Sequence, residues 1–201
     1  MLGEVHGKKI VDYGCGEGKF LEELVVRGAE TYGYDISDAM IKEADRKVGD
    51  KARLGVIESG KMPLPDSCVD AVVSNLVLMM CPSKEVVKQI FQETHRVLVD
   101  GGALIYCITH PAFSDREFTT FRNIFGRGMD YFKEGQRYQF VLRRRDGAEI
   151  TKESFIDYHY PLEMYLNLLP ETGFKLERVK EVPVSGNPVP PYLIVKGSAI
   201  K

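Results

Sequence analysis

The sequence predicts an α/β fold, a doubly wound and mostly parallel sheet of seven strands with an antiparallel last strand. Three observations lead to this prediction. Short apolar runs alternate with segments whose apolar residues recur at helical spacing. A glycine-rich turn joins the first apolar run to the first helical segment. The last two strand-like segments are joined by a loop and not by a helix, which indicates an antiparallel neighbour at the sheet edge.

Strands and helices alternate through the first half of the chain. Ser37 and Ser83 each precede a helical pattern and offer N-cap side chains, while Gly28 is a C-cap for the first helix. Two prolines exclude helix and central strand from residues 63–66. The strands expected here are residues 9–11, 31–35, 53–57, 69–74 and 103–109, and the helices are 20–27, 38–48 and 84–98.

The alternation breaks between residues 110 and 157. This stretch holds aromatic-rich pieces and strand-like runs, at 113–125, 131–132, 138–144 and 149–156. Asp146-Gly147 predicts a hairpin turn between the two runs. We expect a single domain over 1–201, in which 110–157 is a cap inserted between the fifth and sixth strands. Its aromatic residues either line an apolar substrate pocket or form a small satellite core.

The last third returns to regular elements. Pro161 is expected at the first position of a helix, where its missing N–H costs nothing, and Gly173 ends that helix. Strands follow at 174–182 and 192–196, with a proline-rich loop between them.

Composition excludes several classes of partner. The 201 residues carry 27 basic and 29 acidic side chains, a net charge of -2, which gives no general attraction to nucleic acid or to an anionic membrane. The longest apolar stretch, Val69 to Cys81, is interrupted by polar residues and does not span a membrane. The four cysteines form no C-x-x-C pair and are typical of buried thiols in a reducing compartment. We expect a cytoplasmic protein without a signal peptide.

The glycine turn carries the first functional signal. Its sequence is Asp12-Tyr13-Gly14-Cys15-Gly16-Glu17-Gly18-Lys19, and it lies between a strand and a helix. The helix N-terminus directs unpaired N–H groups at a ligand above the strand. Lys19 stands where a dinucleotide fingerprint has its third glycine. Asp35 ends the next strand, where a carboxylate can accept both hydroxyls of a ribose.

These residues resemble class I S-adenosylmethionine-dependent methyltransferases, in particular their small-molecule branch. The resemblance continues at 61–75 and at 96–104, so that four pieces stand in the family's order across roughly the first 110 residues. It implies a seven-stranded Rossmann-like enzyme that binds S-adenosylmethionine, leaves S-adenosylhomocysteine, and transfers methyl by in-line displacement to an O, N or C nucleophile of a small molecule.

The resemblance also implies a cofactor site. Asp12, Gly14, Gly16 and Gly18 would surround the methionine portion, Asp35 the ribose, Ile36 the adenine face, Glu58 and Ser59 the adenine edge, and Asn75 the sulfonium end. The family usually has Asp where Glu58 stands. It also usually has one or more helices before the first strand, where this sequence has eight mostly polar residues. Either the sequence is truncated or the enzyme builds its substrate cover from elsewhere.

Two histidines are candidates for the catalytic base. His110 ends the fifth strand, and His159 precedes the helix that flanks the substrate in this family. A histidine with a near-neutral pKa can accept a proton from a hydroxyl or amine. Each is alternatively a structural or substrate-contacting residue. No spacing in the sequence matches a metal site.

Three other functions fit parts of the pattern. The first alternative is a non-catalytic module that binds either S-adenosylmethionine or another protein. A nicotinamide-dependent oxidoreductase is disfavoured by Lys19. A nucleic-acid methyltransferase is disfavoured by the missing basic face and by Ser74-Asn75-Leu76-Val77 in place of a proline-proline-tyrosine tetrad. We expect a monomer or a homodimer, since a hairpin at 138–156 offers an edge that pairs with another strand.

Overall fold

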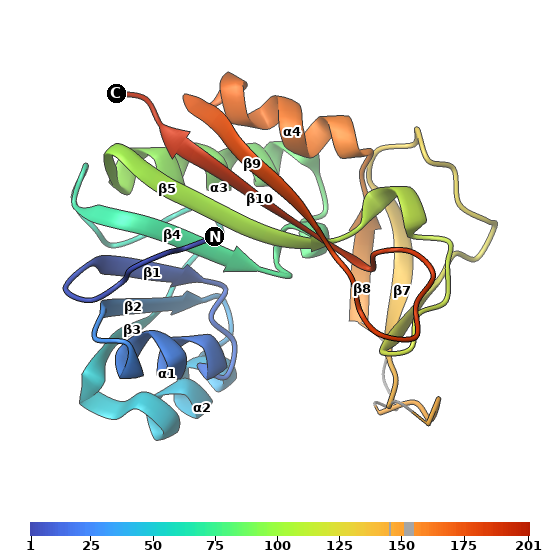
Figure 1. The fold of residues 1–201 in the computed structure, drawn as a ribbon, viewed down its shortest axis with the longest axis horizontal. Coiled ribbons are helices and arrows are strands. Elements are labelled where there is room, and N and C mark those ends of the chain that lie inside the picture. Colours follow the sequence, from blue (N-terminus) through green and yellow to red (C-terminus); the bar gives the residue numbers. More distant parts are fainter. Residues whose placement is uncertain (145, 151–154) are drawn as a thin grey trace.

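The main sheet has seven strands in the order β3-β2-β1-β4-β5-β10-β9. The computed structural model describes residues 1–144, 146–150 and 155–201 (Figure 1). Strand β10 is antiparallel to both of its neighbours, and the β1, β2, β3, β4 and β5 pairs are parallel. The predicted fold class is therefore confirmed. The strands of this sheet are β1 (Lys9–Tyr13), β2 (Glu30–Asp35), β3 (Ala52–Val56), β4 (Val69–Asn75), β5 (Leu98–Thr109), β9 (Phe174–Val182) and β10 (Tyr192–Ala199).

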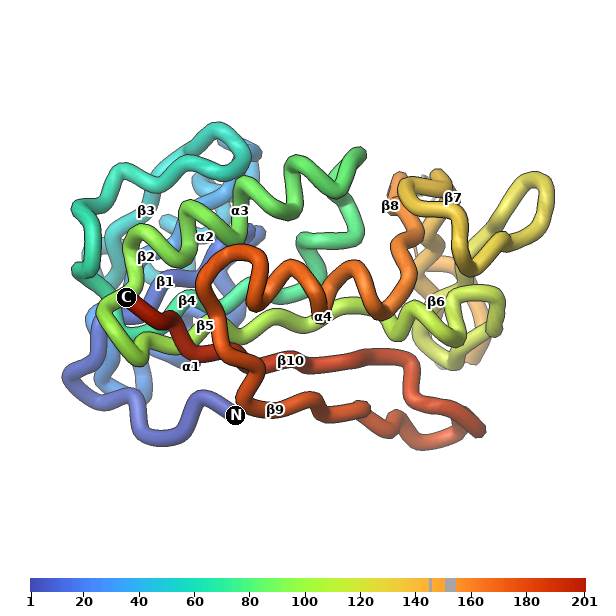
Figure 2. Tube along the Cα trace, turned by 90° about the horizontal axis from the view of Figure 1, so that it is seen from above, coloured from blue at the N-terminus to red at the C-terminus, as the bar shows by residue number. Residues whose placement is uncertain are grey.

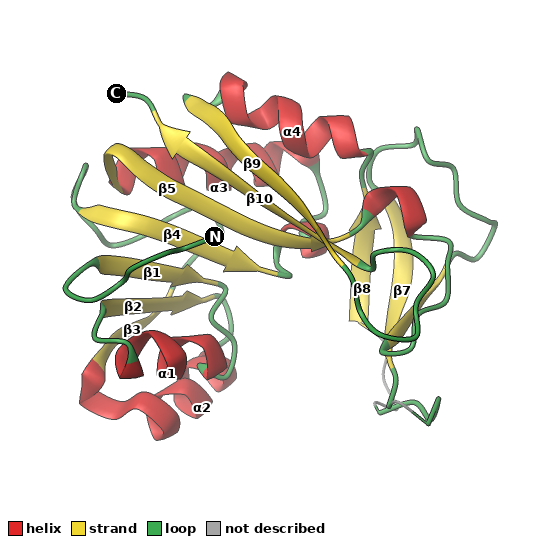
Figure 3. Ribbon diagram, in the orientation of Figure 1, coloured by secondary structure: helices red, strands yellow, loops and turns green. Residues whose placement is uncertain are grey.

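Helices cover both faces of the sheet (Figure 3). Successive side chains of a strand point to opposite faces of the sheet, and the strands are apolar on both faces. Both faces therefore need to be covered by helices. Val11 and Val72 face the core that includes α3 and α4, whereas Ile10 and Val73 pack with Leu24 of α1. The helices are α1 (Lys19–Val26), α2 (Asp38–Val48), α3 (Lys84–Val97) and α4 (Leu162–Glu171).

The serine caps form as expected. The Ser37 hydroxyl accepts from the Met40 N–H at 3.4 Å, and the Ser83 hydroxyl accepts from the Val86 N–H at 3.4 Å. Helices α2 and α3 therefore begin directly after these residues.

A second sheet of three antiparallel strands lies between β5 and α4 in the chain, in the order β6-β7-β8. Its strands are β6 (Phe121–Ile124), β7 (Gln136–Leu142) and β8 (Phe155–His159). Figures 1 and 2 place this sheet beyond the carboxyl ends of the parallel strands, where ligands of open α/β sheets bind. We call residues 110–157 the cap.

The cap differs in detail from the prediction. Strand β6 was not expected, because its four residues show no alternation of apolar and polar side chains, and it forms by pairing with β7. The hairpin turn is present, since the Gly147 N–H donates to the Arg144 carbonyl at 2.8 Å. The expected strand over 149–156 lies partly outside the described residues, and β8 begins at Phe155.

Two element boundaries also move. Helix α4 begins at Leu162, one residue later than predicted, because Pro161 has the extended ψ of 152° and serves as the N-cap. Strand β5 begins at Leu98, earlier than the predicted start at residue 103, because Leu98 pairs with Val69 ahead of a register shift. Within the described residues, every helix is too short or too polar to cross a bilayer.

The core between α3 and the sheet supplies a stability test. Phe91 is fully buried, and its ring lies 5.4 Å from that of Tyr106 and 6.4 Å from that of Phe174. We predict that Phe91→Ala lowers the free energy of unfolding by about 3–5 kcal/mol, as expected for a large aromatic removed from a core. Urea unfolding measures this.

Phe132→Ala is the matched control, since that ring is 80% exposed. Its expected effect is within about 0.5 kcal/mol. Equal losses in the two variants would show that the helix–sheet core does not dominate stability.

Candidate functional site

The turn between β1 and α1 shapes one edge of the sheet. Gly14, Gly16 and Gly18 all have positive φ, at 75°, 51° and 80°. A Cβ on Gly14 would lie 2.3 Å from the Val77 Cγ2 atom, so glycine is required both by conformation and by the close approach of the loop after β4. A Cβ on Gly16 would meet nothing within 4 Å, which leaves the backbone at Gly16 open to a ligand.

The carboxylate of Asp35 lies directly beside this turn. Its Oδ2 accepts from the Gly16 N–H at 2.9 Å, and its Oδ1 accepts from the Ser37 N–H at 2.9 Å. Each carboxylate oxygen has two lone-pair sites and therefore keeps capacity for one further donor. The arrangement can accept a pair of hydroxyl groups while the turn stays fixed.

Asp12 is buried within β1, on the same face as Ile10. Burial, and to a smaller extent the nearby Asp35 carboxylate, together raise the pKa of its carboxyl to about 7. A carboxyl of this kind ionises most readily when a cation binds beside it.

The remaining predicted cofactor residues follow the ends of β2 and β3. Ile36 is 68% exposed, so an apolar surface stands next to Asp35. Glu58 is exposed and pairs with Lys61 at 2.5 Å, which lowers the pKa of the Glu58 carboxyl. Ser59 is exposed beside it. The Ile57 N–H donates to the Asp35 carbonyl at 2.9 Å, which holds the two strand ends together.

Asn75 ends β4 two residues after Val73, the register partner of Asp12. It therefore shares the sheet face of Asp12 and lies one step further along. It lines a hollow of about 280 Å³ together with Phe20 at the start of α1. The structure thus brings Asn75 to the α1 side of the sheet, near the glycine turn.

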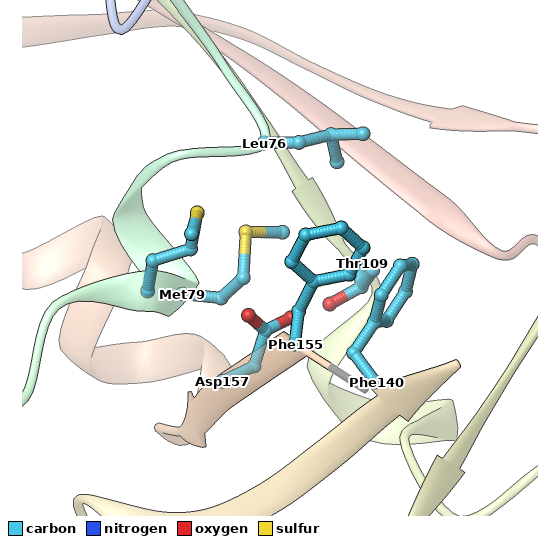
Figure 4. A pocket seen from close by; sticks show the side chains of 7 residues that line it. Leu76, Met79, Thr109, Phe140, Phe155 and Asp157 are labelled. Atoms are coloured by element: carbon cyan, nitrogen blue, oxygen red, sulfur yellow. The ribbon is translucent and has the colours of Figure 1, made fainter. Parts of the chain in front are cut away.

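A second pocket, of about 190 Å³, lies between the end of β4 and the cap (Figure 4). Its wall is apolar and aromatic apart from one hydroxyl and one carboxyl. The lining residues are Leu76, Met79, Met80, Thr109, Phe140, Phe155 and Asp157. Leu76 directly follows Asn75, so neighbouring residues after β4 line the two hollows.

Asp157 is the ionisable group of this pocket. Figure 4 shows its carboxylate turned toward the cavity beside Phe155. Burial raises the pKa of this carboxyl to about 6, although a hydrogen bond from the Tyr138 hydroxyl works in the opposite direction. The same hydroxyl is within hydrogen-bonding reach of Thr109. The carboxyl is therefore oriented by β7 and poised to change charge near neutral pH.

The two histidines predicted as bases do not line this pocket. The His110 Nε2 lies 3.2 Å from a Glu181 carboxylate oxygen, and its Nδ1 accepts from the Ala112 N–H at 3.3 Å. The His159 Nε2 lies 2.9 Å from the Tyr131 carbonyl, and burial lowers the pKa of that imidazole. Their catalytic role stays a prediction that none of these contacts supports.

The sequence reasoning missed Asp157 as a site residue. The available signal was the alternation in Phe155-Ile156-Asp157-Tyr158-His159, which puts Asp157 and His159 on one face of a strand. Both are buried. A carboxyl on the buried face of a strand is unusual enough to mark a site.

Comparison with known proteins points to one family. Residues 11–106 match a family model described as a methyltransferase domain. An S-adenosylmethionine-dependent methyltransferase structure from Mesorhizobium loti has a TM-score of 0.75 and 27% identity, over 98% of this chain and 93% of that one. A structure from Listeria monocytogenes has a TM-score of 0.76 at 22% identity, over 100% and 95% of the two chains, and supports the fold alone.

One sequence relative is matched over a smaller share of its length. A malonyl-[acyl-carrier protein] O-methyltransferase from Hamiltonella defensa is 29% identical over 106 residues. The match spans 53% of this chain but only 40% of that protein.

The buried Asp12 carboxyl predicts a pH dependence of stability. Its pKa is about 7 in the folded protein against a reference value of 3.8, so the folded state binds more protons than the unfolded state between these values. The free energy of unfolding should therefore fall as pH rises from 4 to 7, by an amount of order 4 kcal/mol from this group.

Chemical unfolding across that range, without added ligand, measures the effect. Asp12→Asn should flatten the slope, whereas Asp38→Asn, an exposed carboxyl paired with Lys42, should leave it unchanged. Identical slopes for wild type and Asp12→Asn would contradict the prediction.

Proposed function

Because the chain belongs to the class I S-adenosylmethionine-dependent methyltransferases, we propose that this enzyme methylates an O, N or C nucleophile of a small molecule. The observation that supports a working cofactor site is the bond between the Asp35 carboxylate and the Gly16 N–H. This bond places a carboxylate that can accept hydrogen bonds from ribose hydroxyls beside an open glycine turn at a helix N-terminus. The fold, the donor chemistry and the open side of Gly16 all fit an adenosyl cofactor.

The residue roles are part of the proposal. Asp35 receives the ribose hydroxyls, and the exposed Ile36 side chain packs on the adenine. Glu58 and Ser59 contact the adenine edge. Glu58 gives up its ion pair with Lys61 and binds the adenine in its place. The residues around the methionine portion and the sulfonium end are Asp12, Gly14, Gly16, Gly18 and Asn75.

Bound S-adenosylmethionine supplies a methyl group that is already activated by the sulfonium charge, so orientation and water exclusion are the main tasks left to the protein. The glycine turn and Asp35 fix one side of the site. Asp12 faces this edge as a partly protonated carboxyl and gains charge next to a cation. The loop from Asn75 to Met80 forms the border with the second pocket.

We propose that the cap, residues 110–157, holds the acceptor against that border. The pocket of about 190 Å³ has the size of a small-molecule site or one part of it. Aromatic and methionine side chains supply a dry wall. The malonyl-[acyl-carrier protein] O-methyltransferase relative, matched over 40% of its length, supports an acceptor with a small reacting group.

The cysteines and the net charge bear on the cellular setting and on partners. Four free cysteines fit a reducing compartment, which favours the cytoplasm. We further expect a monomer or homodimer without a nucleic-acid partner, given the net charge of -2.

The cofactor assignment is tested by titration calorimetry with S-adenosylmethionine and, separately, with NADH. Wild type should bind S-adenosylmethionine selectively. Asp35→Ala should weaken this binding about tenfold or more, because hydrogen bonds to a charged carboxylate are lost.

Asp38→Ala is the control, as it removes an exposed carboxylate three residues away that pairs with Lys42. Thermal unfolding of each variant separates lost binding from lost structure. Selective binding of NADH by wild type, or equal affinity for S-adenosylmethionine in wild type and Asp35→Ala, would contradict the proposed site.

A further inference from the structure

The second pocket carries one ionisable side chain among the seven residues that line it. That side chain is Asp157, which is 4% exposed. Leu76, Met79 and Met80 contribute apolar surface from the loop after β4, and Phe140 and Phe155 contribute aromatic rings from the cap. A carboxylate in such surroundings is costly unless a partner offsets its charge.

The described residues give Asp157 a neutral hydroxyl neighbour but no positively charged partner. The Tyr138 hydroxyl on β7 is a neutral polar neighbour of the carboxyl, and Thr109 at the end of β5 adds a second neutral hydroxyl to the pocket. No lysine, arginine or histidine of the described residues forms an ion pair with it. Methionine and phenyl side chains complete the wall, and the face of a phenyl ring stabilises a cation beside it.

We infer that the acceptor is a small apolar or aromatic amine, whose ammonium group Asp157 binds and deprotonates. The inference rests on the proposed function and names its acceptor class. An acceptor that reacts through a carboxylate is disfavoured, because an ionised Asp157 would repel it. A neutral alcohol would lack the charge attraction that the site offers.

The proton step is balanced within the pocket. An N–H bond of the ammonium breaks, its electron pair stays on nitrogen as the lone pair, and the proton passes to an Asp157 oxygen. The nitrogen then forms a bond to the methyl carbon while the carbon–sulfur bond breaks and leaves its pair on sulfur. Asp157 returns its proton to solvent. Ammonium recognition and base catalysis therefore come from one side chain.

Binding of three matched probes tests the inference. 2-Phenylethylamine, 2-phenylethanol and 3-phenylpropanoate share a phenyl body and differ in a cationic, neutral or anionic end. In the presence of S-adenosylhomocysteine, wild type should bind the amine at least about tenfold more tightly than the alcohol, and the alcohol more tightly than the carboxylate. Asp157→Asn should abolish the preference for the amine.

Asp115→Asn is the matched control, an exposed carboxyl in the same cap, and should keep the preference. Asp157→Asn retains the shape and the contact with Tyr138, and its thermal unfolding verifies the fold. A preference for the alcohol or carboxylate in wild type, or an amine preference that survives in folded Asp157→Asn, would overturn the inference.

S-Adenosylhomocysteine titration separates the two proposals. Wild type and Asp157→Asn should bind it equally, since Asp157 lies in the acceptor pocket. Failure of wild type to bind it would overturn the proposed function itself. Normal binding together with absent amine selectivity would overturn only the acceptor class.

Discussion

The carboxylate of Asp35 is the contact on which the geometry of the cofactor edge depends. It accepts from the Gly16 N–H and from the Ser37 N–H, each at 2.9 Å. One group therefore fixes the glycine turn before α1 and the start of α2, where Ser37 also caps the helix. Because both loops are tied to the end of β2, a ligand at this edge meets backbone that is already in place, and little ordering cost accompanies binding.

The loop after β4 joins this edge to the second pocket. Val77 packs so closely on Gly14 that no side chain fits there. Leu76 has a φ of 59°, rare for a leucine, and its N–H donates to the Cys107 carbonyl at 2.9 Å. The Leu76 side chain lines the second pocket. Strained backbone persists where surrounding contacts enforce it, often at functional sites, and here one short segment positions both halves of the site.

The parts of the fold that were predictable depend on local signals. Helix α2 was predicted with its observed bounds, because Ser37 caps it. The glycine turn, the strand ends and Asp35 were predictable as well, because these residues lie close together in the sequence. The second pocket was not predictable, because four separate segments form it and Asp157 becomes buried only when β8 pairs with β7. The histidines were chosen for their chemistry alone, and packing directs them toward Glu181 and the Tyr131 carbonyl.

Asp12 in β1 and Asp157 in β8 share one physical property. Burial raises the pKa of both carboxyls, to about 7 and about 6. Their ionised forms therefore reduce the stability of the free protein near neutral pH. A cation beside either carboxyl offsets this cost, so binding and ionisation reinforce each other. Asp12 faces the side where a sulfonium cofactor is proposed, and Asp157 lines the pocket where the acceptor is proposed. A buried carboxyl would thus favour a positive charge on the methyl donor and on the methyl acceptor alike.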